Sequence, residues 1–472
     1  MENKDDYFVT VGMEVHAELK TKSKMWCSCA NVPLETEANK HTCEICLAEP
    51  GTLPVPNCEA VEKVIRVGLA VGANIADFTE FDRKNYFYPD IPKGYQISQY
   101  KYPIVSGGTL HGIPLTRIHL EEDTAKSDHE SGAYTLVDFN RAGVPLQELV
   151  TEAVTYNSGE EAAKGSAEFG KELQRLLRTL GVSDADMEKG QMRLEANISI
   201  TKDKNKFGTK CEVKNLNSFN SVEKAILYEV ERHKEMLAKG ETIIQETRGW
   251  NEAKQETFSQ RKKENAHDYR YFPDPDLPKM YLHSEFDLDA MRAALPEMPW
   301  TVREKLTAMG IQEKQIEQLV DDAEMYRYFA EATDGLDESS KKTLANYLCT
   351  DAVGLLAKDS NLKLPSAKNF RTIISMINEN KLSSRGAKDL LLDLMTSDTD
   401  AESRAKELNL IQTVDPEALK KIVETVIAEN QKEWAQYKAG ADKLAMFFVG
   451  KCMKASNGAG NPQLFAEIIR NM

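Results

Sequence analysis

Three features that mark common protein classes are missing from this 472-residue sequence. No run of 18 or more apolar residues occurs, which excludes a membrane-spanning helix. The first residues, MENKDDYFVT, contain neither an apolar segment nor a small-residue cleavage site, so the sequence predicts no secretory signal and a cytoplasmic location. The phosphate-binding pattern G-x-x-x-x-G-K-[S/T] is also absent. A nucleotide would therefore have to be held by a metal ion and by side chains of a sheet.

An excess of positive charge is missing as well. The chain has 60 Lys and Arg residues against 75 Asp and Glu, giving a net charge of −15. This balance argues against a general nucleic-acid binder, so any nucleic acid must meet a local basic face or a partner protein. With 41% hydrophobic residues, the composition is that of a soluble globular protein, and the length suits roughly three domains.

Hydrophobic periodicity predicts an α+β fold followed by helices. In MRLEANISI (192–200), apolar and polar residues alternate as in a half-buried strand, and TKCEVKN (209–215) extends this to an antiparallel hairpin. Further strands are predicted in YFVTVGMEVHAEL, PLTRIHL, YTLVDFN and IIQETRG. From LPEMPW onward the pattern is helical. We predict an antiparallel-sheet domain at 1–292, a helical domain at 293–408 and a small helical tail at 409–472.

The segment FDRKNYFYPDIPKGYQISQY (81–100) combines charged, amide and aromatic side chains around two prolines. Pro89 and Pro92 each remove a backbone donor, so we predict a long functional loop and neither a central strand nor a helix. The alternative is an aromatic-rich surface loop.

Four of the eight cysteines cluster in sequence as Cys27-x-Cys29 and, 13 residues later, Cys43-x-x-Cys46. Two thiolate pairs at this separation predict a tetrahedral structural zinc site, in which His41 could replace one thiol. The alternative is four unrelated buried thiols. The other cysteines are expected to lie alone in apolar surroundings.

Acidic residues and a histidine point to a second kind of metal site. Glu14 and His16 share one strand face about 6.6 Å apart, while Glu121, Glu122, Asp123 and Glu148 lie on two other segments. Carboxylates with one imidazole suit Mg²⁺. On spacing alone this is weak evidence, because acidic residues on the polar face of a sheet are usually just solvated.

Several long motifs resemble the GatB subunit of the GatCAB-type tRNA-dependent amidotransferases. They are the 81–100 segment, GMEVHAELKTKSK, RIHLEEDTAKSDH, LVDFNRAGVPLQELVTE, KNLNSF, QETRGW, HDYRYFPDPDLP and FFVGKCMKASNGAGNPQLF. The resemblance implies a glutamine-synthetase-like cradle that phosphorylates the side-chain carboxylate of Glu-tRNA(Gln) or Asp-tRNA(Asn) with ATP and Mg²⁺. It also implies a heterotrimer that includes an amidase (glutaminase) partner, which supplies ammonia, and a small third subunit. Which mischarged tRNA is used stays open.

The resemblance also implies site residues. It assigns Glu14, His16, Glu122 and Glu148 as catalytic magnesium ligands, and Lys84 and Lys93 as residues near the ammonia passage. Substrate or ATP contacts fall to Arg193, Glu195, Asn197, Lys214, Asn215 and Arg248. Simple alternation places Glu122 on the face of Ile118 and Leu120, so Glu121 is the alternative ligand unless the strand ends or bulges. Glu195 stands where the family usually has Asp, which leaves its role open.

The tail carries a local positive excess. From Trp434 onward there are five basic and two acidic side chains, and a glycine-containing turn follows Lys454. Resemblance to the family's tRNA-contacting tail assigns Lys451 and Lys454 to tRNA binding; on charge alone a solvated helix is equally expected. The runner-up function is a zinc-stabilised RNA-binding scaffold without catalysis. Ser339-Ser340-Lys341 does not resemble an amidase signature, so ammonia must come from a partner.

Overall fold

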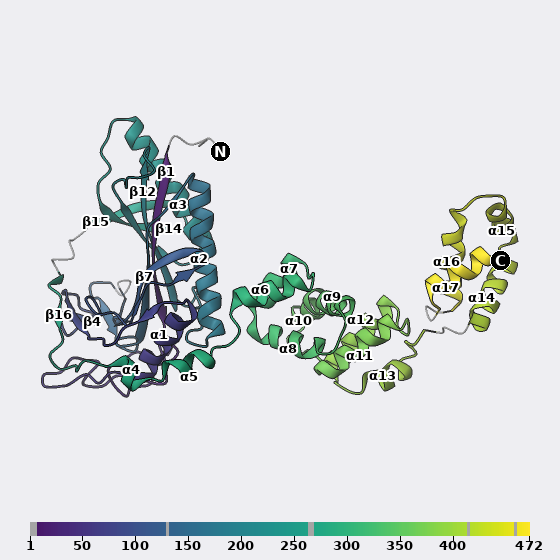
Figure 1. Ribbon diagram of the computed structural model, residues 1–472, viewed down its shortest axis with the longest axis horizontal. Coiled ribbons are helices and arrows are strands. Elements are labelled where there is room, and N and C mark those ends of the chain that lie inside the picture. The colour runs from purple at the N-terminus through teal and green to yellow at the C-terminus, as the bar shows by residue number, and fades with distance from the viewer. Residues whose placement is uncertain (1–6, 129–131, 263–268, 413–415, 457–459) are drawn as a thin grey trace. The chain divides into compact units, whose positions relative to one another are not determined.

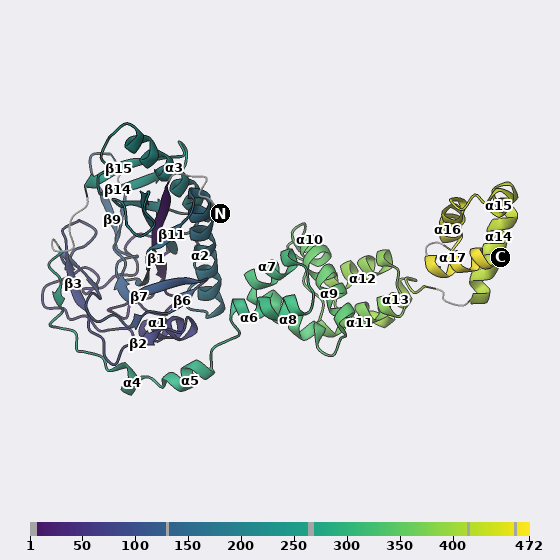
Figure 2. The ribbon, with the colours of Figure 1, turned by 45° about the horizontal axis from the view of Figure 1, so that its top comes forward.

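The computed structural model describes residues 7–128, 132–262, 269–412, 416–456 and 460–472. The chain divides into two compact units, Met1–Pro299 and Trp300–Met472. Figures 1 and 2 show the sheet in the first unit and helices in the second. The change from a sheet in the N-terminal part to helices in the C-terminal part is thus confirmed, whereas the domain bounds at residues 292 and 408 stay predictions.

The first unit contains the strands and five helices among its described residues. The strands are β1 (Phe8–Glu18), β2 (Asn74–Ile75), β3 (Asp82–Asn85), β4 (Tyr95–Ser98), β5 (Val105–Ser106), β6 (Thr109–Leu110), β7 (Ile113–Glu122), β8 (Lys126–Asp128), β9 (Leu136–Asp138), β10 (Pro145–Thr151), β11 (Val154–Tyr156), β12 (Met192–Thr201), β13 (Cys211–Leu216), β14 (Glu246–Asn251), β15 (Glu256–Lys262) and β16 (Phe272–Pro273). The helices are α1 (Cys58–Ala70), α2 (Gly159–Thr179), α3 (Phe219–Ala238), α4 (Leu282–Glu285) and α5 (Leu288–Ala293).

The large sheet has the order β15-β14-β13-β12-β1-β10-β7-β5-β2, with β11 and β6 as side branches. Strand β1 illustrates its two faces: Val11, Met13 and Val15 are buried, while Glu14 and His16 alternate with them on the other face. Helices α1, α2 and α3 pack against strands of this sheet, and Figure 1 shows α2 running alongside it. The apolar face is therefore covered by helices, and the polar face is left for a site.

Helix α2 has capping residues at both ends. Ser158 caps it by accepting a hydrogen bond from the Glu161 N–H, and Gly181 follows its end at φ +64°. The Glu161 carboxylate accepts from the N–H of Asn157 rather than closing back on Ser158. A Cβ on Gly170 would lie 2.7 Å from Leu194 Cδ2, so glycine allows α2 to approach β12 closely.

Most neighbouring strands run antiparallel, including the predicted pair β12 and β13. The prediction of an antiparallel sheet is wrong at one place, because β14 runs parallel to β13. Helix α3 connects these two strands, and a helical crossover is the usual way to join parallel strands. The sheet is therefore mixed.

The 81–100 segment is not a structureless loop, so that prediction is wrong. It forms strands β3 and β4, and β3 is the central strand of a three-stranded sheet with the order β16-β3-β4. Pro89 and Pro92 lie in the connection between the strands, where a missing N–H breaks no ladder.

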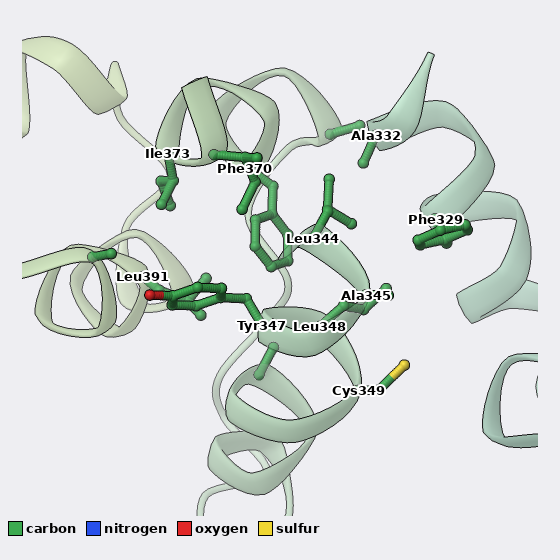
Figure 3. Close-up of a cluster of buried hydrophobic side chains, with 14 of the residues drawn as sticks. Phe329, Ala332, Leu344, Ala345, Tyr347, Leu348, Cys349, Phe370, Ile373 and Leu391 are labelled. Atoms are coloured by element: carbon green, nitrogen blue, oxygen red, sulfur yellow. The ribbon is translucent and has the colours of Figure 1, made fainter. Parts of the chain in front are cut away.

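In the second unit the regular elements of the described residues are helical. They are α6 (Pro299–Ala308), α7 (Glu313–Asp321), α8 (Ala323–Thr333), α9 (Glu338–Asn346), the π-helix η2 (Tyr347–Ala352), α10 (Val353–Leu356), α11 (Ala367–Asn378), α12 (Ser384–Thr396), α13 (Ala401–Glu407), α14 (Pro416–Glu429), α15 (Gln431–Lys438), α16 (Leu444–Ala455) and α17 (Pro462–Asn471). One apolar cluster spans residues 302–405, with Phe329, Leu344 and Phe370 among its members in Figure 3. A separate cluster spans residues 419–469. Within the described part of the chain, no helix is long and apolar enough to cross a membrane.

Candidate active site and metal centres

The polar face of the large sheet gathers side chains from four neighbouring strands. In β1, Glu14 lies opposite Glu195 of β12, and His16 lies opposite Glu148 of β10 on one side and Arg193 on the other. On β7, His119 lies opposite Glu148. Because directly opposed residues of antiparallel strands point to the same face, the register alone places these side chains together.

His16 stands between two carboxylates. Its Nε2 atom lies 3.3 Å from Glu121 Oε1 and 3.4 Å from Glu148 Oε2. His119 Nε2 lies 3.4 Å from the same Glu148 oxygen, and Arg117 Nη2 lies 3.9 Å from its other oxygen. The donor atoms of His16, Glu121 and Glu148 all lie within 4.8 Å of one another, as a shared cation would require.

The electrostatics of this cluster follow from these contacts. Burial alone would lower the pKa of His16, but hydrogen bonds to Glu121 and Glu148 raise it well above its usual value. Burial would raise the pKa of Glu148, but His119 and His16 hold it well below its usual range. For Glu121, burial is again opposed, here by the charge of Lys84 and by His16, and the pKa is lowered. Both carboxylates are therefore ionised at neutral pH.

A second cluster of carboxylates adjoins the one around His16. Glu14, Glu195 and Glu212 offer oxygens within 4.8 Å of one another, and Asn197 Nδ2 donates to Glu14 Oε1 at 3.3 Å. Burial, followed by the charges of Glu148, Glu195 and Glu212, raises the pKa of Glu14. A bound cation or phosphate-associated metal would relieve this repulsion.

Two lysines bring positive charge to these carboxylates. Lys214 Nζ lies 2.7 Å from Glu195 Oε2. Burial would lower the pKa of Lys84, but the charge of Glu121, then Tyr271 and Glu148, raises it well above its usual value. Both lysines line a cleft of about 370 Å³ whose other walls are Tyr86, Tyr88, Asp90, Ile91, Thr124 and Tyr269.

Glu121, not Glu122, lies beside His16. The geometry therefore favours Glu121 over Glu122 as a member of this ligand set. Alternation continues through β7 without a bulge at this point, which turns Glu122 to the other side. There Glu122 pairs with Lys93 at 2.6 Å and accepts the Ile97 N–H at 2.9 Å. Lys93 is thus held by Glu122, away from the carboxylates that surround Lys84.

Arg193 lies on the polar face but pairs elsewhere. Its Nη2 atom lies 3.3 Å from Asp123 Oδ1, and Asp123 also accepts a bidentate bond from Arg141. Burial, with the negative charge of Asp123, raises the pKa of Glu18 on the same face to about 7. Arg193 therefore belongs to a buried ion network at the end of the cluster.

Two predicted substrate contacts lie outside the cluster. Asn215 is exposed at φ +64°, where the pairing of β12 with β13 shifts register. Arg248 lies on the helix-covered side, where its Nε is 3.2 Å from Glu229 of α3. Alternation explains this: in the β13–β14 pair, Arg248 is opposite buried Val213, whereas Lys214 points to the other face.

Glu229 is the centre of a buried network under the sheet. It contacts Arg232 at 2.7 Å and His233 at 3.3 Å, and Arg232 lies 3.7 Å from Cys211 Sγ. The expectation that Cys211 lies alone among apolar groups is wrong. Cys211, Glu229 and His233 have donor atoms within 4.8 Å, but guanidinium groups already neutralise Glu229 and disfavour a metal cation.

Replacing Glu229 by glutamine is expected to lower the unfolding free energy at neutral pH by about 3 kcal/mol. Burial would raise the pKa of Glu229, but hydrogen bonds from His233, Arg232 and Thr257 lower it from 4.5 to about 2. Its ionised form therefore stabilises the fold above pH 4.5, and this contribution is lost as pH falls toward 2. Denaturant unfolding from pH 7 to pH 3 measures it. Glu231→Gln on exposed α3 surface is the control; a difference that persists undiminished in acid would contradict the assignment.

The four clustered cysteines come together as predicted. Cys46 Sγ lies 3.5 Å from Cys27, 3.8 Å from Cys43 and 3.8 Å from Cys29. Tetrahedral Zn²⁺ with bonds of about 2.3 Å separates its sulfur ligands by about 3.8 Å, so the donor set fits a metal such as zinc. His41 does not join it, because its Nε2 lies 3.4 Å from Glu35.

The thiol of Cys46 is the most acidic member of the cluster. A hydrogen bond from Cys27 and the positive charge of Lys24 lower its pKa to about 4, and burial, which acts in the opposite direction, is outweighed.

The carboxylate clusters also fit a hard cation. Octahedral Mg²⁺ ligands at about 2.1 Å lie about 3 Å apart when adjacent and about 4.2 Å when opposite. The separations of 3.3 and 3.4 Å from His16 Nε2 to the oxygens of Glu121 and Glu148 agree with this spacing. The sequence-based assignment did not include His119 and Glu212 among the site residues, although alternation with Glu121 and Lys214 places both on the polar face.

In the tail, Lys451 and Lys454 are exposed on α16. Lys451 Nζ lies 5.5 Å from the ring centre of Phe447, which is also exposed. A basic and aromatic face on one helix is suited to nucleic acid. Part of the predicted turn Lys454–Gly460, like the start of the motif at 267–278, lies outside the described residues.

Comparisons with known proteins decide the family. A family model described as the GatB/GatE catalytic domain matches residues 9–287, and one described as the GatB domain matches residues 327–472. The chain belongs to the GatB family. This confirms the membership that the sequence motifs predict.

Individual GatB proteins match nearly the whole chain. The B subunit of the aspartyl/glutamyl-tRNA(Asn/Gln) amidotransferase of Coxiella burnetii is 42% identical, covering 98% of each chain. That of Gloeothece citriformis is 40% identical over 99% of this chain and 97% of its own. The chloroplastic/mitochondrial B subunit of the glutamyl-tRNA(Gln) amidotransferase of Ostreococcus lucimarinus is 40% identical over 98% and 95%. The cytoplasmic location stays a prediction.

Proposed function

We propose that this chain is the kinase and transamidase subunit of a tRNA-dependent amidotransferase. A side-chain carboxylate oxygen of glutamate or aspartate mischarged on tRNA attacks the γ-phosphorus of ATP, giving an acyl phosphate and ADP. Ammonia then attacks the carbonyl carbon, the C–O bond to phosphate breaks, and one ammonia proton leaves with the phosphate. The products are the amide and inorganic phosphate. An amidase (glutaminase) partner, held together with the small third subunit, supplies the ammonia.

The observation that carries this proposal is that two clusters of carboxylates, one around His16 and one around Glu14, lie on the polar face of the sheet with lysines beside them. The carboxylates around His16 and Glu14 would hold Mg²⁺, with His16 giving up its proton when it serves as a ligand, and the ion would neutralise the phosphoryl group in transfer. Lys84 and Lys214 line the same cleft beside these carboxylates, and their positive charge would stabilise an anionic substrate carboxylate and its acyl phosphate. The sequence has no P-loop, so the proposal assigns ATP binding to the metal ion and to side chains of the sheet.

The remaining residues have supporting roles in this proposal. Arg193 would orient the carboxylate of Asp123, and Asn197 would orient that of Glu14. Glu195 holds Lys214 in place. The cysteine cluster would bind a structural zinc ion, because it contains no open position for a substrate once four thiolates close it.

The test is ATP hydrolysis by the chain reconstituted with its amidase and small partners in the cytoplasmic complex. We expect hydrolysis only when mischarged tRNA is present, with one amide formed per ATP when glutamine is supplied. Correctly charged tRNA is the control. A complex that binds tRNA through this chain but never turns over ATP would support the zinc-stabilised scaffold instead.

The tail should supply part of the tRNA affinity. Each phosphate contact by a lysine contributes about 0.9 to the slope of log affinity against log salt. Lys451→Ala with Lys454→Ala on α16 is therefore expected to lower that slope by about two and to raise the KM for mischarged tRNA several-fold. Filter binding over a salt series measures the slope.

The matched control removes two other exposed lysines, Lys420→Ala with Lys421→Ala on α14. It changes the net charge equally and should leave the slope nearly unchanged. If both double variants lower the slope equally, the salt-dependent part of tRNA binding comes from the overall charge of the chain, and α16 makes no specific contact with tRNA.

A further inference from the structure

Lys24 is a lysine with no exposed surface. Its relative exposure is 0%, and it is among the largest fully buried side chains of the chain. Its ammonium group donates to the His41 carbonyl at 2.8 Å, to the Phe139 carbonyl at 3.0 Å and to Cys46 Sγ at 3.5 Å. All three ammonium protons therefore have acceptors, and one of these is a member of the cysteine cluster.

The charge of this group needs an explanation. Among the described residues, no carboxylate lies within ion-pair distance of Lys24. An isolated ammonium is costly to bury, and carbonyl acceptors satisfy its protons without balancing its charge. The thiol group of Cys46 is the one acceptor that can carry negative charge.

We propose that Lys24 is the internal counter-cation of a four-thiolate metal centre formed by Cys27, Cys29, Cys43 and Cys46. The inference rests on the proposed zinc site. A divalent ion with four thiolates has a net charge of about −2. Cys27, Cys29 and Cys43 are partly exposed, but Cys46 is buried, so the charge on its side of the centre is little screened by water. The Lys24 ammonium halves the net charge there through an N–H···S contact, and the buried ammonium gains a negative partner.

The same side chain ties the centre to the rest of the unit. The Phe139 carbonyl begins the segment that contains Arg141 and Gly143, and the Met25 N–H donates to the Gly143 carbonyl at 2.7 Å. Gly143 N–H in turn donates to the Asp123 carbonyl at 3.0 Å. A purely structural bridge between loops is therefore the rival explanation, and the experiment must separate it from a charge effect.

The decisive measurement is zinc affinity, determined by competition with a chromophoric chelator on the purified full-length chain. Lys24→Met removes the charge and the donors with little change in volume, and Lys24→Gln keeps N–H donors for the two carbonyls without the charge. Both variants are expected to bind zinc about 10–100-fold more weakly, as for other groups that support metal ligands. Lys22→Met, two residues away and exposed, should bind as tightly as the parent.

Cobalt substitution gives a second readout. The parent and both variants should show the thiolate charge-transfer absorption of a four-sulfur site, with the variants saturating at higher free cobalt. If either variant folds with a changed melting temperature but unchanged zinc affinity, Lys24 is a loop bridge and the proposal is overturned. If the parent itself binds no zinc, the zinc site fails first and the role of Lys24 fails with it.

Discussion

Glu148→Gln is expected to lower the rate of tRNA-dependent ATP hydrolysis by about a thousandfold, because it removes a charge from the centre of the carboxylate cluster. Glu148 contacts both His16 and His119, and its pKa is held well below the usual range, so its ionised form is the one present. Glutamine keeps the shape and an oxygen acceptor but cannot offset a cation. The affinity for tRNA should change little, since phosphate contacts lie elsewhere.

Steady-state kinetics of the reconstituted complex, together with Mn²⁺ binding by electron paramagnetic resonance, measure this effect. Glu152→Gln is the matched control, because Glu152 follows the same strand but is exposed and bonded to Thr116. Near-normal turnover of Glu148→Gln with unchanged Mn²⁺ affinity would remove the cluster from the reaction.

Lys84→Met is expected to lower kcat for amidation by about a hundredfold with little change in the KM for tRNA. Lys84 lines the cleft with Lys214 and is held in its charged form by the charge of Glu121 and its neighbours. Its charge should therefore stabilise the acyl phosphate more than the bound ground state.

The assay should be run with glutamine and with ammonium chloride as nitrogen source. A loss with both sources is expected if Lys84 acts on the activated carboxylate. A loss with glutamine alone would assign Lys84 to the ammonia route instead. Lys101→Met in the segment after β4 is the control, because Lys101 is exposed and lies over Tyr102.

Alternation predicted the polar face of the sheet from sequence. In β1 and β12 the residues Glu14, His16, Arg193, Glu195 and Asn197 all point where a period of two places them. The same rule favours Glu121 over Glu122, and the structure agrees with the rule rather than with the motif-based assignment. Local pattern was sufficient here because register in a half-buried sheet is fixed by the apolar face.

Non-local pairing explains what the sequence could not show. The β3 strand becomes central only because Phe272 and Pro273, far along the chain, pair with it. Arg248 falls on the helix-covered face because it lies opposite buried Val213, and the parallel pairing of β14 with β13 that sets this register is not evident from the sequence of either strand. Lys24 looks like an ordinary surface lysine in KTKSK, and only the folding of residues 41, 46 and 139 around it buries the ammonium.

The most direct test of the proposed chemistry follows an oxygen atom. Glu-tRNA(Gln) or Asp-tRNA(Asn) labelled with ¹⁸O in the side-chain carboxylate is amidated by the reconstituted complex, and the released phosphate is analysed by mass spectrometry. Activation by phosphorylation predicts one ¹⁸O atom in the phosphate for each amide formed, because the bridging oxygen of the acyl phosphate leaves with phosphorus. Phosphate that contains only unlabelled oxygen, with amide still produced, would contradict the account.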